Sequence, residues 1–374
     1  MRLFSSPSEV VAQTGDAAWL RAMLDFEAAF AGALAEVGLA DAAAAEEIAA
    51  ACASEGYLDL DALGEGTAKD GTPVPALLAQ LRPRLSEEGE TVLHRGATSQ
   101  DVVDTAAMLV AKRALEPLLA DLDAAGDAAA ALADRHRADE CAGRTLLQQA
   151  APITFGLRAA NWLAGLDDAA ARLTAVRDGR LAVQLGGAAG SLVAFGDKGP
   201  AVVEALARRL DLPAPAAPWH ANRSRPVELA AALGQAAGAA GKVGIDIVLL
   251  AQTEVGEVAE GQPGASSAMP HKRNPAAAVN AVAATRRTPG LVATMLAAMP
   301  GEEERAAGAW QAEAETLSEL LRVTGVAVAA ARRSLEGLEV FPERMRANLE
   351  VSGETGATDA IIDRALAAHR ERAR

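Results

Sequence analysis

The chain has 374 residues and is 51% hydrophobic but only 3% aromatic, so its core must be built from Ala, Leu and Val. Side chains of that kind pack best in close-set helices, and the length allows two or three folding units. The formal net charge of −15 disfavours nonspecific binding to nucleic acid and promotes solubility.

Several features bear on the compartment of the protein. Cys52 and Cys141 lie far apart without metal-ligand spacing, which indicates neither a disulfide framework nor a zinc site. Residues 1–14 hold one early Arg and no continuous apolar stretch, so they lack the pattern of a secretory signal. The most apolar segment, 229–251, contains a Lys and an Asp, which are costly at a bilayer centre. We therefore expect a soluble cytoplasmic protein that neither spans a membrane nor binds nucleic acid.

Helical spacing of apolar residues begins near the N-terminus, and alternating strand patterns are nearly absent. The pattern predicts an amphipathic helix over 16–37, a second over 41–55 and a third over 74–85. A much longer helix is then expected to open at the sequence 94–101. Residues 1–104 are expected to form a small N-terminal helical domain.

Unusually long helices are predicted in the rest of the chain, over 105–136, 151–178, 225–260 and 309–335. Lengths above roughly 25 residues are typical of a coiled-coil-like bundle whose helices pack against partner chains. We therefore expect an all-α fold with a central long-helix bundle at 105–338 and a short C-terminal helical segment at 339–374. Loops rich in Gly, Pro, Ser and Arg mark the bundle ends, where functional residues concentrate, at 186–190, 213–226 and 261–275.

The loop 264–275 carries the strongest chemical signal, with the sequence Gly-Ala-Ser-Ser-Ala-Met-Pro-His-Lys-Arg-Asn-Pro. The hydroxyls of Ser266 and Ser267, consecutive backbone N–H groups, Lys272 and Asn274 form a set of donors. Such a set can surround a carboxylate or its enolate-like dianion. The same residue types also suit a solvated loop with a basic tip, and the types alone leave both interpretations open.

This loop resembles the signature loop of the fumarase and aspartase superfamily, Gly-Ser-Ser-x-Met-Pro-x-Lys-x-Asn, with Ala265 where the family usually has Gly. The resemblance implies that Ser266 is the proton-transferring base. It also implies that the substrate is held by Ser267, Met269, Lys272 and Asn274. A serine is a poor base until its alkoxide is stabilised, so the N–H groups and Lys272 must act inside a closed site.

A second region, residues 94–101, reads His-Arg-Gly-Ala-Thr-Ser-Gln-Asp. It resembles the first motif of the superfamily in the form found in bacterial 3-carboxy-cis,cis-muconate cycloisomerases. Thr98 and Asp101 also predict a capping box at a helix start. Since a capped helix N-terminus facing a cleft is an anion site, we expect Thr98, Ser99 and His94 to bind a substrate carboxylate.

A third region, residues 143–150, resembles the second superfamily motif, in which most lyases have a His after the Thr. Here that position is Leu146. In many relatives this His pairs with a Glu five residues after the loop Asn, and that position is Val279. The resemblance implies that the substrate contacts Arg144, Thr145 and Gln148.

The joint absence of this His and Glu bears on the reaction. Elimination of an alcohol-like or amine leaving group benefits from a proton donor. In muconate lactonisation the nucleophile is the substrate's own carboxylate, which is ionised at neutral pH. Only the proton beside a carboxylate then needs an enzyme group, which Ser266 can supply. An adenylosuccinate-type lyase, which would need another donor, and a noncatalytic helical scaffold remain as alternatives.

The segments 184–191, 218–225 and 304–315 also resemble cycloisomerase segments. His220, Arg223 and Arg225 suit a surface basic cluster, but together they also offer what a tricarboxylate needs. We expect one or two of them to be ligands, with His220 and Arg223 as the candidates. The resemblance implies interconversion of 3-carboxy-cis,cis-muconate and 4-carboxymuconolactone in protocatechuate breakdown. It further implies a homotetramer with active sites shared between subunits, a small polycarboxylate substrate, and no metal or organic cofactor.

Overall fold

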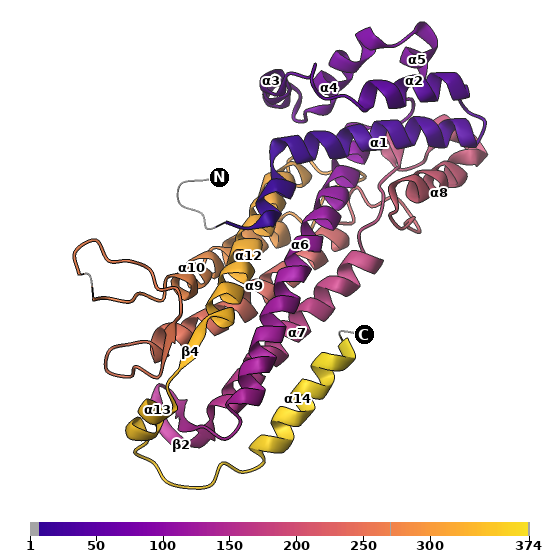
Figure 1. Cartoon of the computed structure of the whole chain (residues 1–374). Helices are drawn as coiled ribbons and strands as arrows, with labels where there is room; N and C mark the ends of the chain where they lie inside the picture. The colour runs from indigo at the N-terminus through magenta and orange to yellow at the C-terminus, as the bar shows by residue number, and fades with distance from the viewer. Residues whose placement is uncertain (1–6, 270, 373–374) are drawn as a thin grey trace.

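The computed structural model describes residues 7–269 and 271–372, and most of them are helical, so the expected all-α class is confirmed. Long helices run side by side through an elongated molecule, and shorter helices cover one end (Figure 1). We call the latter the N-terminal cap; it contains α1 (Asp16–Glu36), α2 (Ala42–Cys52), α3 (Leu60–Asp70), α4 (Val74–Leu81) and α5 (Glu87–Val92). The predicted helices over 16–37, 41–55 and 74–85 correspond to α1, α2 and α4.

Helix α1 joins the cap to the rest of the molecule. Its apolar residues recur at helical spacing, and Leu24, Phe26 and Phe30 are fully buried. The ring of Phe30 stacks on Phe26 and meets the ring of Phe195 edge-on, with centroids 6.0 Å apart. Burial of a Leu or Phe side chain contributes about 2 kcal/mol, so this cluster fastens the segment before α8 to the cap.

The central bundle is built on three long helices, α6 (Ser99–Arg135), α7 (Phe155–Gly179) and α9 (Ser224–Leu250), together with α12 (Glu313–Glu336). Helix α6 is continuous through residues 104 and 105, where the sequence pattern placed a domain boundary. Shorter helices complete this part of the chain: α8 (Gly199–Leu210), α10 (Ala276–Thr285) and α11 (Thr288–Ala297). Short 3-10 helices occur at Glu9–Thr14, Arg82–Arg84, Gly187–Ala189, Val193–Lys198 and Trp310–Ala312.

The scarcity of aromatic residues is matched by close approach of the helices. A Cβ added at Gly244 of α9 would lie 2.9 Å from the carbonyl oxygen of Ala278 in α10. One added at Gly241 would lie 2.6 Å from a methyl carbon of Thr285. The two helices therefore pack backbone against backbone, which only small residues permit.

Helix α9 is the one helix among the described residues that is long and apolar enough to cross a bilayer by length and composition. Half of its most apolar stretch is buried, and it packs against α7, α10 and α12. Asp246 of α9 accepts a hydrogen bond of 2.7 Å from the indole N–H of Trp162 in α7. These contacts are those of a bundle core helix.

Two antiparallel strand pairs interrupt the helical pattern, β1 (Glu140–Thr145) with β2 (Gln148–Thr154) and β3 (Val258–Glu260) with β4 (Leu338–Val340). The prediction of a helix from residue 151 was therefore wrong at its start. Thr154 is the N-cap of α7 and accepts a hydrogen bond of 3.2 Å from the Leu157 N–H, which fixes the helix start at Phe155. The helix predicted over 225–260 likewise ends at Leu250.

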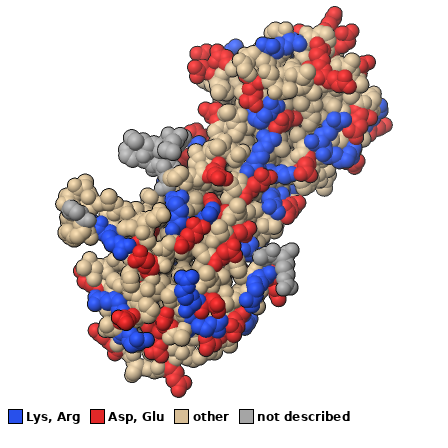
Figure 2. Space-filling model, in the orientation of Figure 1, with Lys and Arg blue, Asp and Glu red and all other residues tan. Residues whose placement is uncertain are grey.

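The C-terminal segment contains α13 (Pro342–Asn348) and α14 (Thr358–Arg372), so its expected helical character is confirmed. Charged side chains of both signs are interspersed over the face shown in Figure 2, and charged groups also hold α14 to the bundle. The imidazole of His369 lies 2.9 Å from Asp167 of α7 and 3.0 Å from Asp127 of α6. Arg372 contacts Asp167 at 2.8 Å and Asp123 at 2.7 Å.

Docking of α14 should depend on pH. Burial lowers the pKa of His369, but the hydrogen bonds to Asp167 and Asp127 raise it by more, so its pKa lies above the ordinary value. Charged His369 therefore stabilises docking below about pH 6.5, and this contribution is lost as pH rises through the raised folded-state pKa. We expect amide protection factors across residues 358–372 to fall on going from mildly acidic to alkaline pH. His369→Asn should remove this dependence, and pH-independent protection in the unmodified protein would contradict it.

Candidate active site

The three regions expected to carry chemistry are divided between the two ends of the bundle, one at the first end and two at the other. The region 94–101 leads into the first turn of α6 beside the cap, whereas 143–150 forms the β1–β2 hairpin beyond the other end of α6 (Figure 1). Helix α6 has 37 residues, which corresponds to roughly 55 Å. The loop 264–275 belongs to the hairpin's end, since Glu257 contacts the hairpin and Glu260 supports the loop. One chain therefore does not bring the three regions together.

The carboxylate of Asp101 organises the cap end of the candidate site. It is fully buried and accepts hydrogen bonds from the N–H groups of Thr98 (2.9 Å), Gly186 (2.9 Å) and Gly187 (3.0 Å). The Nε2 atom of His220 lies 2.7 Å from the same carboxylate. The predicted capping box is confirmed, and His220, although 119 residues from Asp101 in sequence, lies beside it.

Arg305 is a site residue that the sequence pattern did not single out. Its guanidinium donates to the Thr98 hydroxyl at 2.6 Å and to the carbonyl oxygens of Gly187 at 3.0 Å and Ala188 at 2.9 Å. Its Nε–H is buried and has no hydrogen-bond partner among the described residues. Arg305 belongs to the segment 304–315, whose resemblance was noted, but residue types alone could not show that it reaches Thr98.

His94 and Ser99 lie on either side of Thr98. His94 has a φ of 58°, and its Nδ1 lies 2.7 Å from the buried carboxylate of Glu27 in α1. Burial lowers the pKa of His94, but the charge and hydrogen bond of Glu27 raise it by more, so its pKa lies above the ordinary value. Ser99 is the first residue of α6 and is partly buried. Their contact with substrate stays a prediction.

Arg223 is held by buried ion pairs within the chain, and its contact with substrate stays a prediction. It is 3% exposed, and its guanidinium donates to Asp104 with two bonds of 2.8 Å and to Glu313 at 2.9 Å. The remaining donor positions face backbone carbonyl groups. Arg223 therefore links α6, the start of α9 and the start of α12, as a buried ion cluster does.

At the opposite end, Arg144 is paired with Glu257. The two form bonds of 2.7 and 3.2 Å, and Glu257 is fully buried. Arg158 lies 4.0 Å from the same carboxylate. Asn348 also donates to it at 3.1 Å, which ties α13 to the hairpin. Arg144 thus fixes the hairpin to the bundle, while any contact with substrate stays a prediction.

The tip of the hairpin is apolar and strained. Thr145 and Gln148 pair across it, and between them Leu146 and Leu147 have φ values of 51° and 64°. Left-handed backbone costs a non-glycine residue about 1–2 kcal/mol. Leu146 is nevertheless 95% exposed and Leu147 75% exposed in the single chain. Positive φ at both positions is what a tight two-residue hairpin turn requires, so the turn itself accounts for this backbone conformation. The exposure of the two leucine side chains is not explained by contacts with other described residues of the chain.

The loop 264–275 is closed at its base and otherwise projects from the bundle (Figure 1). Gly264 and Asn274 pair through backbone hydrogen bonds of 2.8 and 3.3 Å, and the Asn274 amide faces the Gly264 carbonyl at 3.4 Å. Ser266 accepts a hydrogen bond of 3.1 Å from the Met269 N–H. This donor suits stabilisation of a Ser266 alkoxide.

Three other loop residues from the predicted set, Ser267, Met269 and Lys272, are exposed. Glu260 supports the loop from below, because its carboxylate accepts from the N–H groups of Ala277 at 3.1 Å and Ala278 at 2.8 Å at the start of α10. The described part of the loop therefore has a firm base and exposed side chains toward its tip.

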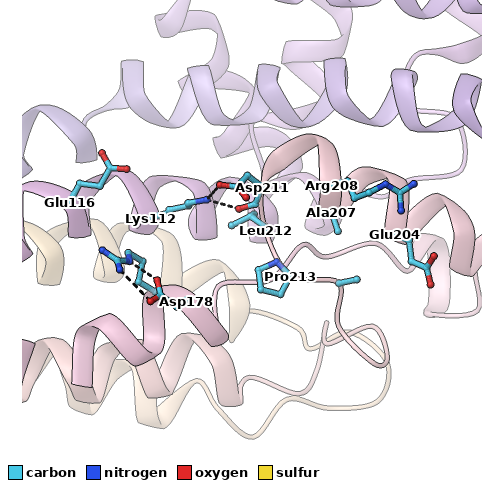
Figure 3. Close-up of a pocket in the computed structure, with 11 residues that line it drawn as sticks. Lys112, Glu116, Asp178, Glu204, Ala207, Arg208, Asp211, Leu212 and Pro213 are labelled. Carbon is cyan, nitrogen blue, oxygen red and sulfur yellow. Dashed lines mark hydrogen bonds and ion pairs between the residues drawn. The ribbon is translucent and has the colours of Figure 1, made fainter. Parts of the chain in front are cut away.

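A cavity of about 840 Å³ lies between α6, the end of α7 and α8 (Figure 3). Its cationic groups are already neutralised: Lys112 lies 2.6 Å from Asp211, and Arg177 lies 2.7 Å from Asp178. It contains none of the predicted site residues. A second groove, of about 720 Å³, is lined by Arg144, Thr145 and Leu146 of the hairpin with parts of α7 and α9. The groove, unlike the cavity, is lined by predicted site residues, Arg144 and Thr145.

Replacement of Arg223 should cost stability rather than substrate affinity. Arg223→Met leaves two buried carboxylates without a partner, so we expect unfolding to become easier by about 3–5 kcal/mol. Arg225→Met is the matched control, since Arg225 donates only to the Arg180 carbonyl at 2.8 Å, and its loss should cost about 1 kcal/mol. Chemical denaturation and steady-state kinetics check both. A stable Arg223→Met protein with a raised KM would restore Arg223 to the ligand set.

Comparison with known proteins places these regions in a family. Residues 5–290 match a family model described as lyase. The 3-carboxy-cis,cis-muconate cycloisomerase of Bradyrhizobium diazoefficiens is 44% identical over 93% of this chain and 78% of that protein. The nitrosuccinate lyase of Streptomyces davaonensis is 42% identical over 92% of this chain and 75% of that protein.

A solved structure is similar over the whole molecule. The crystal structure of 3-carboxy-cis,cis-muconate lactonizing enzyme from Pseudomonas putida is 35% identical, with a TM-score of 0.92, and covers 99% of this chain and 98% of that chain. The helical bundle, the signature loop and these similarities agree, and the chain is an enzyme that belongs to the fumarase and aspartase superfamily of lyases.

Proposed function

We propose that the protein is a cycloisomerase that interconverts 3-carboxy-cis,cis-muconate and 4-carboxymuconolactone in aromatic compound breakdown. The observation that carries the proposal is Leu146, an exposed leucine where most lyases of the superfamily have a histidine. A reaction that needs no acid at this position is therefore favoured. The relatives named for this reaction, at 42–45% identity, support the same substrate.

The chemistry needs one proton transfer. In lactonisation, an oxygen of one substrate carboxylate attacks an alkene carbon, and a proton adds to the neighbouring carbon, which lies beside another carboxylate. In reverse, the Ser266 alkoxide removes that proton, the lactone C–O bond breaks, and its electron pair leaves on the carboxylate. A carboxyl group has a pKa of about 4, so the leaving group departs as an anion without a proton donor.

The remaining residues hold a substrate with three negative charges. Lys272 and the Met269 N–H would stabilise the alkoxide and the enolate-like intermediate, with Ser267 and Asn274 beside them. At the cap end, the first N–H groups of α6, the hydroxyls of Thr98 and Ser99, and Arg305 would bind a carboxylate, with His94 nearby. Thr145 and Gln148 would border the site from the hairpin.

Such a site requires several chains, and we propose a homotetramer. Packing the long helices of different chains antiparallel would set the cap end of one against the loop and hairpin ends of others. Large apolar side chains on the bundle are exposed in the single chain, and an assembly would bury them: Leu146, Leu147, Ile245, Val279, Leu296 and Met299. Free, buried Cys52 and Cys141 fit a reducing cytoplasm, with no nucleic-acid or membrane partner.

Elimination of nitrite from nitrosuccinate is a second candidate, because the nitrosuccinate lyase noted above is 42% identical to this chain. Nitrite, like a carboxylate, is a weak base and leaves as an anion, so Leu146 is compatible with either reaction. An adenylosuccinate-type lyase expels an amine and would need a proton donor that Leu146 cannot provide.

A substrate panel tests the proposal. The purified protein should turn over 3-carboxymuconate with a far higher kcat/KM than nitrosuccinate, adenylosuccinate, argininosuccinate or fumarate. Ser266→Ala should lower kcat by roughly 10²–10⁴-fold without loss of helicity, because it removes the base and no core contact. Lys272→Ala should cost about 3 kcal/mol of transition-state stabilisation. The exposed Ser54→Ala in the cap is the control, and a preference for nitrosuccinate would transfer the assignment to the second candidate.

Mixed assemblies should reveal shared sites. Ser266→Ala inactivates the loop end and Arg305→Ala the cap end, so each protein alone should be nearly inactive. If these ends come from different chains, random co-assembly restores both in about a quarter of the sites. Co-expression of the two variants should therefore recover about a quarter of wild-type activity. A co-expressed mixture no more active than its parts would mean that each chain supplies its own complete site.

Restoring the missing acid should not help the reaction. Leu146→His with Val279→Glu introduces polar groups where the chain has apolar ones and adds negative charge near a trianionic substrate. We expect the double variant to lower cycloisomerase activity, as measured with carboxymuconate beside adenylosuccinate. A large gain in cycloisomerisation would show that a general acid was missing.

A further inference from the structure

We infer that Asp101 is a positioning residue, one that aims Arg305 and the Thr98 hydroxyl at a substrate carboxylate; this rests on the proposed function of the cap end. Asp101, Thr98, Gly187 and Arg305 form a closed circuit of hydrogen bonds. The Thr98 N–H (2.9 Å) and the Gly187 N–H (3.0 Å) both donate to one oxygen, Oδ2, of Asp101. Arg305 donates to the Gly187 carbonyl (3.0 Å) and to the Thr98 hydroxyl (2.6 Å), which closes the circuit.

This circuit joins three distant parts of the chain. It passes from the first turn of α6 to the 186–187 turn, then to the segment before α12, and back to α6. Each member is held at two points, so movement of any one member must disturb the others. Asp101 is the member with no exposed surface, and two bonds of the circuit end on its Oδ2.

The surroundings of Arg305 differ from those of Arg144 and Arg223. Arg144 and Arg223 each face buried carboxylates at 2.9 Å or less. Among the described residues, Arg305 makes no ion pair with a carboxylate, and its three hydrogen bonds go to neutral oxygens. Its buried Nε–H also lacks a protein partner. A guanidinium held by neutral groups at a helix N-terminus keeps its charge for an anion.

His220 contacts the carboxylate oxygen of Asp101 that is not part of the circuit. Its Nε2 lies 2.7 Å from Oδ1 of Asp101, the oxygen that also accepts from the Gly186 N–H at 2.9 Å. A Cβ added at Gly186 would lie 2.7 Å from the imidazole Cε1, so ring and backbone are in close contact. His220 is 3% exposed. We therefore assign it to holding Asp101 rather than to binding substrate directly.

The arrangement also separates the charge of Asp101 from the anion it helps to bind. Four N–H groups surround its carboxylate, and it is completely buried. Donors to both oxygens disperse its negative charge. Arg305 and the Thr98 hydroxyl lie on the partly exposed side of the circuit. The substrate would then meet the cation and the hydroxyl, not the carboxylate.

Asp101→Asn tests the inference. The amide group keeps the shape of the side chain. Its NH₂ nitrogen, unlike a carboxylate oxygen, cannot accept the hydrogen bonds that the Thr98 and Gly187 N–H groups donate to Oδ2. We expect KM for carboxymuconate to rise roughly 10- to 100-fold, with a smaller change in kcat. Calorimetry with propane-1,2,3-tricarboxylate as probe should show a matching loss of affinity. Asp121→Asn is the control on the same helix, because Asp121 pairs with Arg332 away from the site, and it should leave both values unchanged.

His220 provides a second, independent arm. His220→Gln keeps an N–H donor for Asp101 and should stay close to wild type, whereas His220→Leu should reproduce the rise in KM. A purely structural role would lower Tm without separating Gln from Leu in KM or in probe affinity. An active wild type whose Asp101→Asn and His220→Leu forms both retain KM and affinity overturns the inference. If Asp101→Asn does not fold, an unchanged His220→Leu overturns it alone. Lack of wild-type turnover with intact probe binding would instead count against the proposed function.

Discussion

The length of α6 is the constraint on which the rest of the structure depends. Its 37 residues set the start of the helix and the β1–β2 hairpin about 55 Å apart. Groups suited to binding a carboxylate lie at one end, and the serine suited to moving a proton lies toward the other. If these groups serve one site, as proposed, packing between chains would have to bring them together, because a single chain keeps them apart. The exposed side chains of Leu146 and Leu147 are consistent with a surface that packs against another chain.

The arginines differ in whether a carboxylate neutralises their charge. Arg223 and Arg144 are neutralised by buried carboxylates, and they lock the bundle and the hairpin in place. Arg305 is held by a hydroxyl and two carbonyl groups, so its charge is not consumed by the fold. A buried ion cluster supplies rigidity, whereas a cation held by neutral oxygens supplies affinity for an anion. The same residue type therefore performs two tasks, which its partners decide.

The helices were predictable from sequence because apolar periodicity and caps are local, and α1 and α2 lie where the pattern placed them. The signature loop could be recognised by its resemblance, which also indicated Ser266. The hairpin at 140–154 was missed because its strands are short and Pro152 and two Gln residues obscure any alternation. The ion pairs of Arg223 could not be predicted, because residue type does not reveal a partner 119 residues earlier. Arg305 was missed for the same reason, since its contact with Thr98 spans 207 residues.

Light scattering of the purified protein during dilution, with carboxymuconate turnover recorded on the same samples, is the most direct test of a site shared between chains. A site shared between chains predicts a mass four times that of the 38.2 kDa chain and a specific activity that falls in step with any dissociation. A monomer that retains full specific activity would show that one chain completes the site across the length of α6, and the central claim would be wrong.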